Sequence, residues 1–420
     1  IKMKKNIETD ILSTKFMKPD AYGSLAMPVY HTAAYEFPNA KAMENAFCGR
    51  SPEHAYSRIS NPTVQYLERR IQSVTGGISV SALNSGMSAI SNALFTVASA
   101  GCNIIASSHL FGNTLSLLTN TLGGLGVELR VAHLDDIGQT EALFDENTCA
   151  LFLEVITNPQ MEVADLAALA EISHRHHVPL IADSTIVPFT VFHAKDFGVD
   201  IEVLSSTKYI SGGATGLGGI IIDYGSFDWS QSHSSALRDR TVHTGRQFAF
   251  TARLKQELIP NLGTLMTPQA AYMETLGMET LDIRFRCQSS SALWLARQLK
   301  SVDGIVSVNY PGLEDNPFYK ISRKQFGELP GAMLTVDLES REACFSFIDH
   351  LKLIHRATNL FDHKSLAIHP ASTIFGTFTD SQRLTMNVKQ STVRLSIGLE
   401  EKEDLLEDIR QSLSESVRQI

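Results

Sequence analysis

Short apolar runs alternate with amphipathic stretches between residues 63 and 261. The apolar runs predict buried strands, and the stretches with helical periodicity predict helices between them. Alternation of this kind is typical of a mostly parallel sheet with helices on both faces. The predicted strands are Ser79–Leu83, Asn103–Ala106, Glu128–Val131, Ala150–Ile156, Pro179–Ala182, Ile201–Leu204 and Gly219–Ile222, and the predicted helices include Thr63–Val74, Met87–Val97, Leu115–Leu122 and Asp165–His176.

The pattern changes on both sides of this region. Residues 1–62 show little periodicity and are interrupted by Pro28, Pro38, Pro52 and Pro62. Ordering such a segment alone is costly, so we expect an arm that packs against a neighbouring subunit. Residues 262–420 predict a smaller α/β domain with one long helix, Thr267–Leu299, strands near Ile305–Asn309, Met333–Asp337 and Val393–Ile397, and helices near Arg341–Leu351 and Lys402–Val417.

Composition narrows the class of protein. The chain has 420 residues, of which 43% are hydrophobic and 19% charged, and its net charge of −9 disfavours nucleic acid as a partner. No apolar run reaches about 18 residues, so no membrane span is expected. Residues 3–12 lack the apolar core of a secretory signal. The cysteines show no paired spacing, which indicates a reduced, cytoplasmic protein; they are Cys48, Cys102, Cys149, Cys287 and Cys344.

Lys208 stands just after the predicted strand Ile201–Leu204, in the sequence SSTKYISGG. Open α/β sheets bind their ligands at the carboxyl ends of strands. A desolvated lysine there can react as a neutral amine and form a Schiff base, while nearby hydroxyls and a glycine-rich backbone can hold a phosphate. Together these features indicate pyridoxal 5'-phosphate (PLP). An ordinary strand end with an exposed lysine has the same appearance, so this stretch alone leaves both interpretations open.

Three further strand or helix ends carry suitable side chains. Asp183 ends the predicted strand Pro179–Ala182, one crossover upstream of Lys208, so both should lie at one edge of the sheet. A carboxylate there can pair with a protonated pyridine nitrogen. Asn158 follows another predicted strand, and Gly86 and Met87 begin a helix whose free amide groups can bind phosphate.

Six blocks in a fixed order resemble the Cys/Met metabolism family of PLP-dependent enzymes, over about residues 22–399. They are NSGMSAI, EVITNPQ, IADSTIVPF, SSTKYISGG, KSLAIHPAST and VRLSIGLE. The resemblance implies an α/β protein of the fold-type I PLP-dependent transferase class, with a mostly parallel sheet flanked by helices. It also implies an N-terminal arm (1–62), a PLP-binding domain (63–261), a smaller C-terminal domain (262–420), and a homo-oligomer, either a dimer or a homotetramer built as a dimer of dimers.

The family's site residues map onto matching positions of this sequence. Lys208 is expected to hold the cofactor and to move protons. The resemblance further implies that Asp183 binds the pyridine nitrogen of the cofactor, that Asn158 donates to the 3'-oxygen of its ring, and that Phe111 stacks on the ring. The phosphate is expected to be held by Gly86, Met87, Ser205 and Thr207, together with Tyr56 and Arg58 of a neighbouring subunit. Arg394 and Asn359 are expected to contact the substrate. No metal is expected, because the His174–His177 run suits a helix C-terminus.

Within the family the later blocks are most similar to O-acetylhomoserine sulfhydrylases. That similarity implies γ-replacement, in which O-acetylhomoserine and a sulfide donor give homocysteine and acetate. O-succinylhomoserine sulfhydrylase, cystathionine γ-synthase and methionine γ-lyase activities are the alternatives, although Asn113 stands where the γ-lyases typically carry cysteine. A catalytically silent binding protein is the alternative from a different class.

Four positions depart from the family pattern. Phe111 replaces a usual tyrosine, Gly213 and Phe375 replace usual histidines, and Phe361 replaces a common glycine. A pocket without a phenol still suits γ-replacement, because acetate leaves more easily than a thiolate. The same departures are compatible with an unusual sulfur source, such as a sulfur-carrier protein in place of free sulfide.

Overall fold

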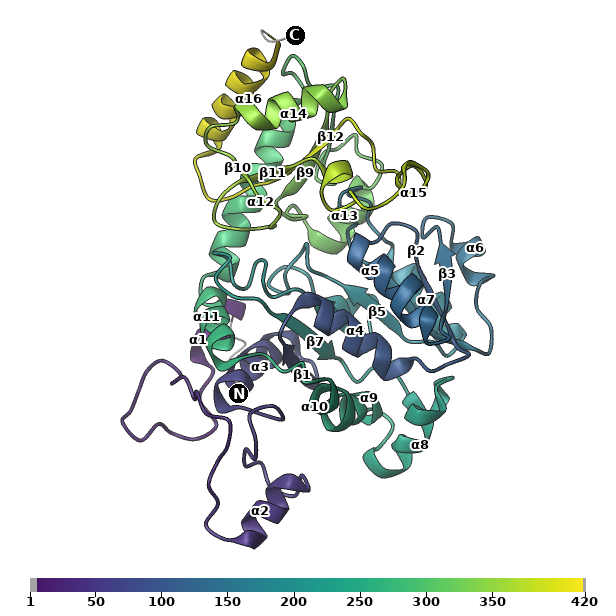
Figure 1. The fold of residues 1–420 in the computed structure, drawn as a ribbon, viewed down its shortest axis with the longest axis vertical. Helices are drawn as coiled ribbons and strands as arrows, with labels where there is room; N and C mark the ends of the chain where they lie inside the picture. Colours follow the sequence, from purple (N-terminus) through teal and green to yellow (C-terminus); the bar gives the residue numbers. More distant parts are fainter. Residues whose placement is uncertain (1–5, 418–420) are drawn as a thin grey trace.

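The computed structural model describes residues 6–417 and contains two sheets (Figure 1). The larger sheet has the strand order β1-β7-β6-β5-β4-β2-β3, and only β7 runs antiparallel to its neighbours. Every strand predicted for this sheet is observed, with ends shifted by at most two residues. The strands are β1 Ser79–Leu83, β2 Asn103–Ser107, β3 Glu128–Ala132, β4 Thr148–Glu154, β5 Leu180–Asp183, β6 Ile201–Leu204 and β7 Gly219–Asp223.

Both faces of this sheet are buried under helices, as the continuous apolar strands require. Along β4, Leu151 and Leu153 join one apolar cluster and Phe152 joins the other. Helices α3 and α7 pack on the first face, and α4 packs on the second. The helices of this region are α3 Pro62–Thr75, α4 Gly86–Val97, α5 Gly112–Ser116, α6 Ile137–Glu141, α7 Leu166–Arg175, α8 Ser235–Thr244, α9 Ala249–Arg253 and α10 Ile259–Leu262, with π-helical turns at Leu117–Leu122 and Leu254–Leu258.

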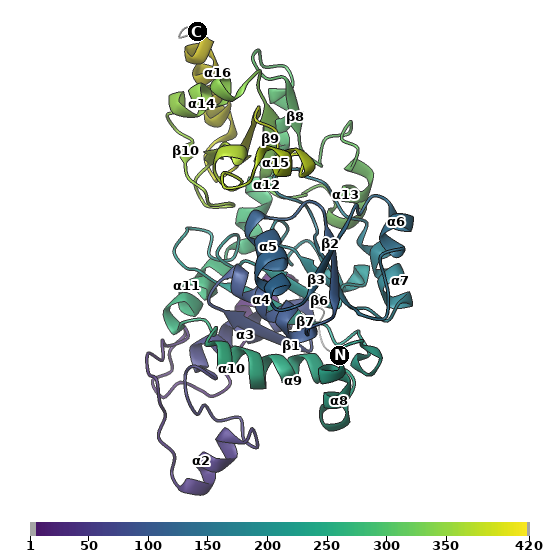
Figure 2. The ribbon, with the colours of Figure 1, turned by 45° about the vertical axis from the view of Figure 1, so that its right-hand side comes forward.

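The smaller sheet lies at the other end of the molecule and has the order β10-β11-β12-β9-β8 (Figure 2). Helices α12 and α14 pack on this sheet, and α16 packs on both of them. The elements are β8 Ser307–Asn309, β9 Met333–Asp337, β10 His355–Arg356, β11 Leu366–Ile368 and β12 Thr392–Ser396, with α13 Tyr319–Phe326, α14 Arg341–His350, α15 Asp380–Thr385 and α16 Lys402–Val417.

The single long helix predicted for Thr267–Leu299 is wrong, because the chain forms two helices there. Helix α11 spans Pro268–Met278 and α12 spans Leu281–Leu299. Thr280, between them, has a non-helical backbone (φ −117°, ψ 10°). Gly277 lies directly against the loop after Lys208, since a Cβ there would be 2.1 Å from the carbonyl oxygen of Ile210. The helical pattern of apolar residues continues through Thr280 in the sequence, but this tertiary contact and the turn into the smaller domain interrupt the helix there.

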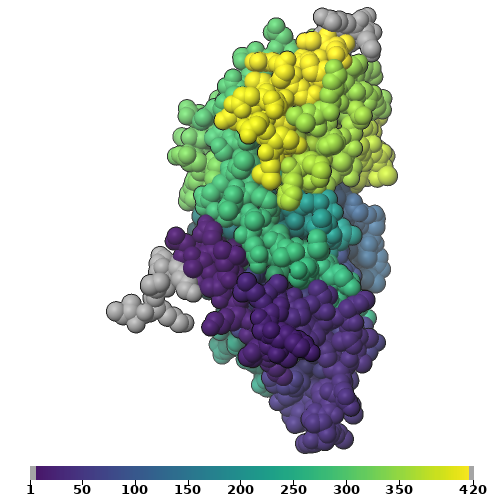
Figure 3. All heavy atoms as spheres, turned by 90° about the vertical axis from the view of Figure 1, so that its left-hand side faces the viewer, coloured from purple at the N-terminus to yellow at the C-terminus, as the bar shows by residue number. Residues whose placement is uncertain are grey.

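The N-terminal segment is mostly irregular and lies on the outside of the molecule, at the end away from the smaller sheet (Figure 3). It contains two short helices, α1 (Ile7–Ser13) and α2 (Ala40–Phe47). Tyr22 and Leu25 are 97% and 99% exposed.

The first five residues of the predicted arm lie outside the described residues. No helix within residues 6–417 is long and apolar enough to cross a membrane.

Candidate functional site

A cavity of about 540 Å³ opens where the carboxyl ends of β4, β5 and β6 face the smaller domain. Strand β4 contributes Glu154, β5 contributes Asp183, and the turn after β6 contributes Lys208. The parallel register explains this meeting, because Glu154 pairs with Asp183 and Asp183 with Val203 across neighbouring strands. The remaining lining residues are Ser85, Gly86, Met87, Ile90, Phe111, Ile156, Asn158, Thr185, Ile186, Ser205, Thr207, Leu217, Thr358, Leu360, Thr373, Ile374 and Arg394.

Lys208 presents a reactive amine to this cavity. Its Nζ atom donates a hydrogen bond to Oδ1 of Asn359 at 2.8 Å. Burial, with a smaller contribution from the positive charge of Arg394, lowers the pKa of Lys208 to about 8. A substantial share of the amine is therefore neutral near physiological pH and able to attack an aldehyde.

Asp183 presents a buried carboxyl group to the same cavity. Its Oδ1 atom accepts a hydrogen bond from the backbone N–H of Thr185 at 2.9 Å. Burial raises the pKa of Asp183 to about 6, against the lowering effect of its hydrogen bonds to Thr185. Within residues 6–417, no lysine or arginine forms an ion pair with it. A protonated pyridine nitrogen would supply the missing positive charge.

A cradle for a phosphate lies between the start of α4 and the turn before Lys208. Ser85 caps α4 by accepting from the N–H of Ser88, and the first amides of a helix have no intrahelical acceptor. A Cβ at Gly86 would lie 2.7 Å from the Cβ of Ser205, so only glycine lets the two segments approach this closely. The Thr207 hydroxyl accepts from the N–H of Gly218 at 3.0 Å and fixes the glycine-rich turn.

Glu154 is a residue of this cavity that the sequence analysis missed. Its carboxylate accepts from the backbone N–H of Phe111 at 2.6 Å and also from that of Asn158. Burial and the nearby Asp183 raise the pKa of Glu154 to about 8. One side chain thus positions both the ring at the cavity wall and the asparagine loop. The available signal was a lone acidic residue inside the otherwise apolar run Ala150–Ile156.

Arg394 comes from β12 of the smaller domain and is only 2% exposed. Its Nη1 and Nη2 atoms donate to Oδ1 of Asn158 (3.1 Å) and to the carbonyl oxygen of Asn359 (3.3 Å). The buried Nε atom has no partner among the described residues, and burial lowers the pKa of Arg394 to about 9. A buried arginine with a free donor and no carboxylate beside it is suited to bind a carboxylate ligand.

Tyr56 and Arg58 do not line this cavity. Arg58 donates from Nη1 to the carbonyl oxygen of Pro260 at 2.5 Å and lies 5.6 Å from the ring centre of Tyr56, which is 40% exposed. The predicted contact of these two residues with a neighbouring subunit's phosphate stays a prediction.

Of the four departures from the family pattern, only Phe111 lines the cavity. Phe361 is buried in a stack on Tyr209, with ring centres 4.0 Å apart. Phe375 is buried in a small apolar cluster. A Cβ at Gly213 would make ordinary contact with the imidazole of His363, at 3.4 Å.

The histidine run forms no metal cluster. His174 pairs with Asp200 at 2.7 Å and His176 with Glu141 at 3.2 Å. Across residues 6–417, no group of three or more histidines, cysteines and carboxylates could hold a metal ion.

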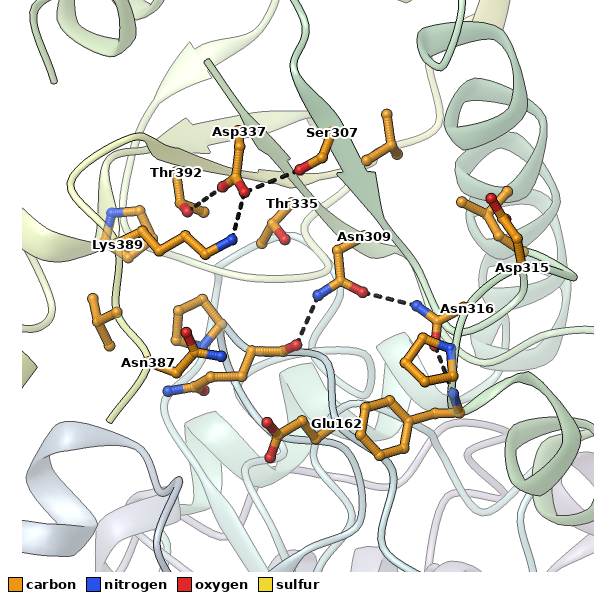
Figure 4. Close-up of a pocket in the computed structure, with 18 residues that line it drawn as sticks. Glu162, Ser307, Asn309, Asp315, Asn316, Thr335, Asp337, Asn387, Lys389 and Thr392 are labelled. Carbon is orange, nitrogen blue, oxygen red and sulfur yellow. Dashed lines mark hydrogen bonds and ion pairs between the residues drawn. The ribbon is translucent and has the colours of Figure 1, made fainter. Parts of the chain in front are cut away.

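The loop that carries Asn158 also borders a second, more polar cavity of about 450 Å³, because Pro159 and Gln160 line that cavity. Figure 4 shows this second cavity. There the Asn309 amide donates to the carbonyl oxygen of Gln160 at 2.8 Å, and Asn316 donates to Asn309 at 2.9 Å. These contacts anchor the loop to the smaller domain and fix where Asn158 meets Arg394.

Comparisons with known proteins agree with this geometry. The family model described as Cys/Met metabolism PLP-dependent enzyme matches residues 8–414. The chain is 34% identical over 398 residues to the O-acetyl-L-homoserine sulfhydrylase of Corynebacterium glutamicum, and the match covers 91% of each protein.

Two solved structures are also similar. One, from Campylobacter jejuni, is assigned as an O-acetylhomoserine (thiol)-lyase and was solved with N'-pyridoxyl-lysine-5'-monophosphate; it is 32% identical, with a TM-score of 0.93 over 98% of this chain and 100% of that one. The other, the O-acetylhomoserine sulfhydrylase of Wolinella succinogenes, is 43% identical, with a TM-score of 0.75 over 85% of this chain and 98% of that one. The fold-type I class expected from the sequence is confirmed, and the chain belongs to the Cys/Met metabolism family of PLP-dependent enzymes.

Proposed function

We propose that this chain catalyses a γ-replacement in which O-acetylhomoserine and a sulfide donor give homocysteine and acetate. The observation that carries the proposal is the pairing of a low-pKa lysine with a buried arginine in one cavity: Lys208 reaches Asn359, and Arg394 donates to the same residue. An amino acid bound there would have its carboxylate on Arg394 and its reacting carbons near Lys208. The names of the similar sulfhydrylases support this substrate class.

PLP, when bound, supplies the electron sink that makes substrate carbon–hydrogen bonds acidic. Asp183 would pair with its protonated ring nitrogen, Phe111 would cover its ring, and Asn158 would donate to its 3'-oxygen. Its phosphate would lie against the start of α4, beside Gly86, Met87, Ser205 and Thr207. Lys208 would attach the cofactor and then accept and return protons at the substrate carbons.

The cavity walls favour an acetyl over a succinyl ester. Lys208 and Arg394 are the only cations among the described lining residues, and both already have roles. The other lining residues from the small domain carry no charge; they are Thr358, Leu360, Thr373 and Ile374, and Leu217 of the glycine-rich turn is also apolar. A succinyl group would bring a second carboxylate next to these side chains, and burying an unpaired charge is costly. We therefore propose that the acyl group is neutral.

Product analysis tests the proposal. The holoenzyme is incubated with O-acetylhomoserine and sulfide, with O-succinylhomoserine and sulfide, or with methionine alone, and homocysteine, acetate and 2-oxobutyrate are measured. We expect homocysteine and acetate in equal amounts from the first mixture, and a lower kcat/KM for the succinyl ester. Faster release of 2-oxobutyrate from methionine alone would instead indicate a γ-lyase, and no turnover in a PLP-loaded protein would indicate a silent binding protein.

The sulfur donor is proposed to be free sulfide or sulfur bound to a carrier protein. The 43% identical Wolinella succinogenes enzyme is described as using a novel mechanism of sulfur transfer, which supports testing both. Turnover is compared at increasing sulfide concentrations. Saturation at low concentration supports free sulfide, whereas a rate that stays proportional to sulfide supports a carrier.

The assembly and location are part of the same proposal. Residues 1–62 would form an arm on a neighbouring subunit, 63–261 the PLP-binding domain and 262–420 the domain that closes the cavity. The exposed apolar side chains of the arm support burial against a second copy, as in a dimer or a dimer of dimers. None of the five cysteines forms a disulfide, which supports a cytoplasmic location.

A further inference from the structure

Cys102 and Cys149 bring two sulfur atoms together far from the cavity. Cys102 immediately precedes β2, and Cys149 is the second residue of β4. Both lie at the amino-terminal edge of the larger sheet, whereas Lys208 follows the carboxyl end of β6. Their Sγ atoms are 3.1 Å apart. This is closer than ordinary contact between two sulfur atoms and about 1 Å longer than a disulfide bond.

A local irregularity of the sheet produces this contact. In the β2–β4 pairing, Asn103 is opposite Thr148 and Ile104 is opposite Ala150, so Cys149 has no partner residue on β2. Cys102 is fixed in place, since its N–H donates to the carbonyl oxygen of Ser99 and its own carbonyl accepts from Glu128. The observed approach of the two Sγ atoms, on neighbouring strands, is what brings the pair within reach of a disulfide.

The two thiols differ in a way that suits stepwise oxidation. Cys102 is partly exposed, and its sulfur accepts hydrogen bonds from Cys149 and from the N–H of Ser99, which lower its pKa to about 7. Cys149 is 2% exposed, and its pKa is raised well above its ordinary value by the hydrogen bond to Cys102 and by burial. Cys102 therefore presents an accessible thiolate, and Cys149 a buried thiol next to it.

We propose that Cys102 and Cys149 form an oxidation site that a hydroperoxide converts to a disulfide. The Cys102 thiolate attacks the peroxide oxygen, the oxygen–oxygen bond breaks, and hydroxide (or an alkoxide, which takes a proton from water) leaves, so Cys102 becomes a sulfenic acid. The Cys149 sulfur then attacks the Cys102 sulfur, the sulfur–oxygen bond breaks, and the Cys149 proton leaves with the hydroxide as water. Two thiols are oxidised and one peroxide is reduced.

This site is independent of the proposed reaction at Lys208. The disulfide would tie the start of β2 to β4 without touching the cavity. The other three thiols have no sulfur neighbour within the described residues: Cys48 and Cys287 are exposed, and Cys344 is buried. Oxidation within one chain should therefore select one pair of the five cysteines.

The test treats the full-length holoprotein with hydrogen peroxide, removes the excess peroxide, and unfolds the protein in denaturant that contains N-ethylmaleimide, so that the buried thiols Cys149 and Cys344 also react; the protein is then digested for mass spectrometry. We expect a cross-linked peptide pair joining Cys102 and Cys149, with maleimide still found on Cys48, Cys287 and Cys344. Reduction with dithiothreitol should abolish the cross-link. Maleimide on both Cys102 and Cys149 after peroxide treatment would overturn the proposal, and so would a preferred cross-link of either residue to another cysteine.

Variants separate the two steps. In Cys149→Ser, Cys102 lacks its second thiol, so a dimedone-type probe should label it as sulfenic acid, whereas the wild-type protein should show little label. Cys48→Ser is the matched control and should give the wild-type yield of cross-link. Absence of label on Cys102 in folded Cys149→Ser would contradict the assignment of Cys102 as the residue attacked first. If that variant does not fold, the wild-type cross-link measurement still decides the proposal.

Discussion

The Nζ atom of Lys208 donates a hydrogen bond to Oδ1 of Asn359 at 2.8 Å, across the boundary between the two sheets. The Asn359 side-chain amide also donates to Asp362 at 3.3 Å, and its backbone carbonyl accepts from Arg394. One loop residue of the smaller domain thus contacts the reactive amine and the arginine proposed to bind the substrate carboxylate. Movement of this loop would change both groups together.

The rate at which the apoprotein binds PLP covalently is expected to follow the neutral fraction of Lys208. Burial first, and the charge of Arg394 second, lower the pKa of this lysine to about 8, so the amine is mostly protonated below that pH and mostly neutral above it. The rate should rise about tenfold per pH unit below about pH 8 and level off above it. Stopped-flow absorbance at a fixed PLP concentration measures the profile.

Arg394 provides the control for this profile. Arg394→Gln removes the second cause of the shift, so the midpoint should move to higher pH, while Arg394→Lys keeps a positive charge and should move it less. A rate that does not change with pH across about 6 to 9 would show that Lys208 protonation does not govern loading.

Asp183→Asn keeps the side-chain shape and removes the negative charge proposed to face the pyridine nitrogen. We expect kcat to fall by about 10²-fold or more, a loss of a few kcal/mol of transition-state stabilisation. Steady-state assays with O-acetylhomoserine and sulfide measure this. The control is Asp228→Asn, at a partly exposed position outside the cavity where asparagine can still accept from the N–H of Ser230. Rates within about twofold of wild type would place the charge partner elsewhere.

The strand ends of this chain were predictable, because their signals are local. The residue types after the apolar runs ending near Ala182 and Leu204 were enough to place Asp183 and Lys208 at one edge of the sheet. The break at Thr280 was not predictable in this way, since it depends on the approach of Gly277 to the carbonyl oxygen of Ile210, far away in sequence.

The polar positions inside the site were harder to assign than its strand ends. Glu154 lies within a strand, and its role comes from the backbone N–H groups of Phe111 and Asn158. The effects of Gly213 and Phe361 also depend on tertiary neighbours, His363 and Tyr209 respectively. Residue identity showed that these positions were unusual, whereas the consequence required the fold.

Glu154 is expected to support cofactor binding by positioning Phe111 and Asn158. Glu154→Ala leaves two buried N–H groups without their acceptor, at a cost of about 1–3 kcal/mol each. The Kd for PLP should therefore rise at least about tenfold. Glu154→Gln retains one acceptor oxygen and should be affected less. Equilibrium titration of the apoproteins with PLP measures the Kd of both variants. An unchanged Kd in a folded Glu154→Ala variant would show that Glu154 does not support cofactor binding.

Glu274 is expected to make folding stability depend on pH. It is fully buried in α11 beside Ser206 and Gly218, and burial raises its pKa from 4.5 to about 8. Between these two values the folded state holds a proton that the unfolded state has released. The free energy of unfolding should therefore fall as pH rises, by up to about 1.4 kcal/mol per pH unit.

Glu274→Gln removes this titration and should flatten the slope between about pH 5 and 8. Denaturant unfolding of the apoproteins at a series of pH values makes the comparison. Part of the slope should remain, because burial also raises the pKa of Glu154 to about 8 and that of Glu202 to about 7. An unchanged slope would mean that Glu274 stays ionised in the folded protein.

The proposed subunit contact predicts that each active site needs two chains. If Arg58 binds a neighbouring subunit's cofactor phosphate, Arg58→Ala removes a charge-assisted contact of roughly 1.5–3 kcal/mol and should weaken PLP binding. Arg50→Ala is the matched control, since Arg50 lies in the same segment and pairs with Glu44. It should leave PLP affinity unchanged.

Mixing the Arg58→Ala and Lys208→Ala variants, at a PLP concentration too low to load Arg58→Ala sites, then distinguishes a shared site from a single-chain site. In a dimer of one Arg58→Ala chain and one Lys208→Ala chain, one site has both lesions, and the other combines an intact Lys208 with the partner's intact arginine. Subunit exchange should therefore restore part of the homocysteine-forming activity, toward a quarter of the wild-type level if chains pair at random and one intact site works alone. A single-chain site allows no recovery, because each chain carries its own lesion. Native mass spectrometry verifies exchange, and absence of recovery in verified mixed dimers would show that residues 1–62 do not complete a neighbouring subunit's site.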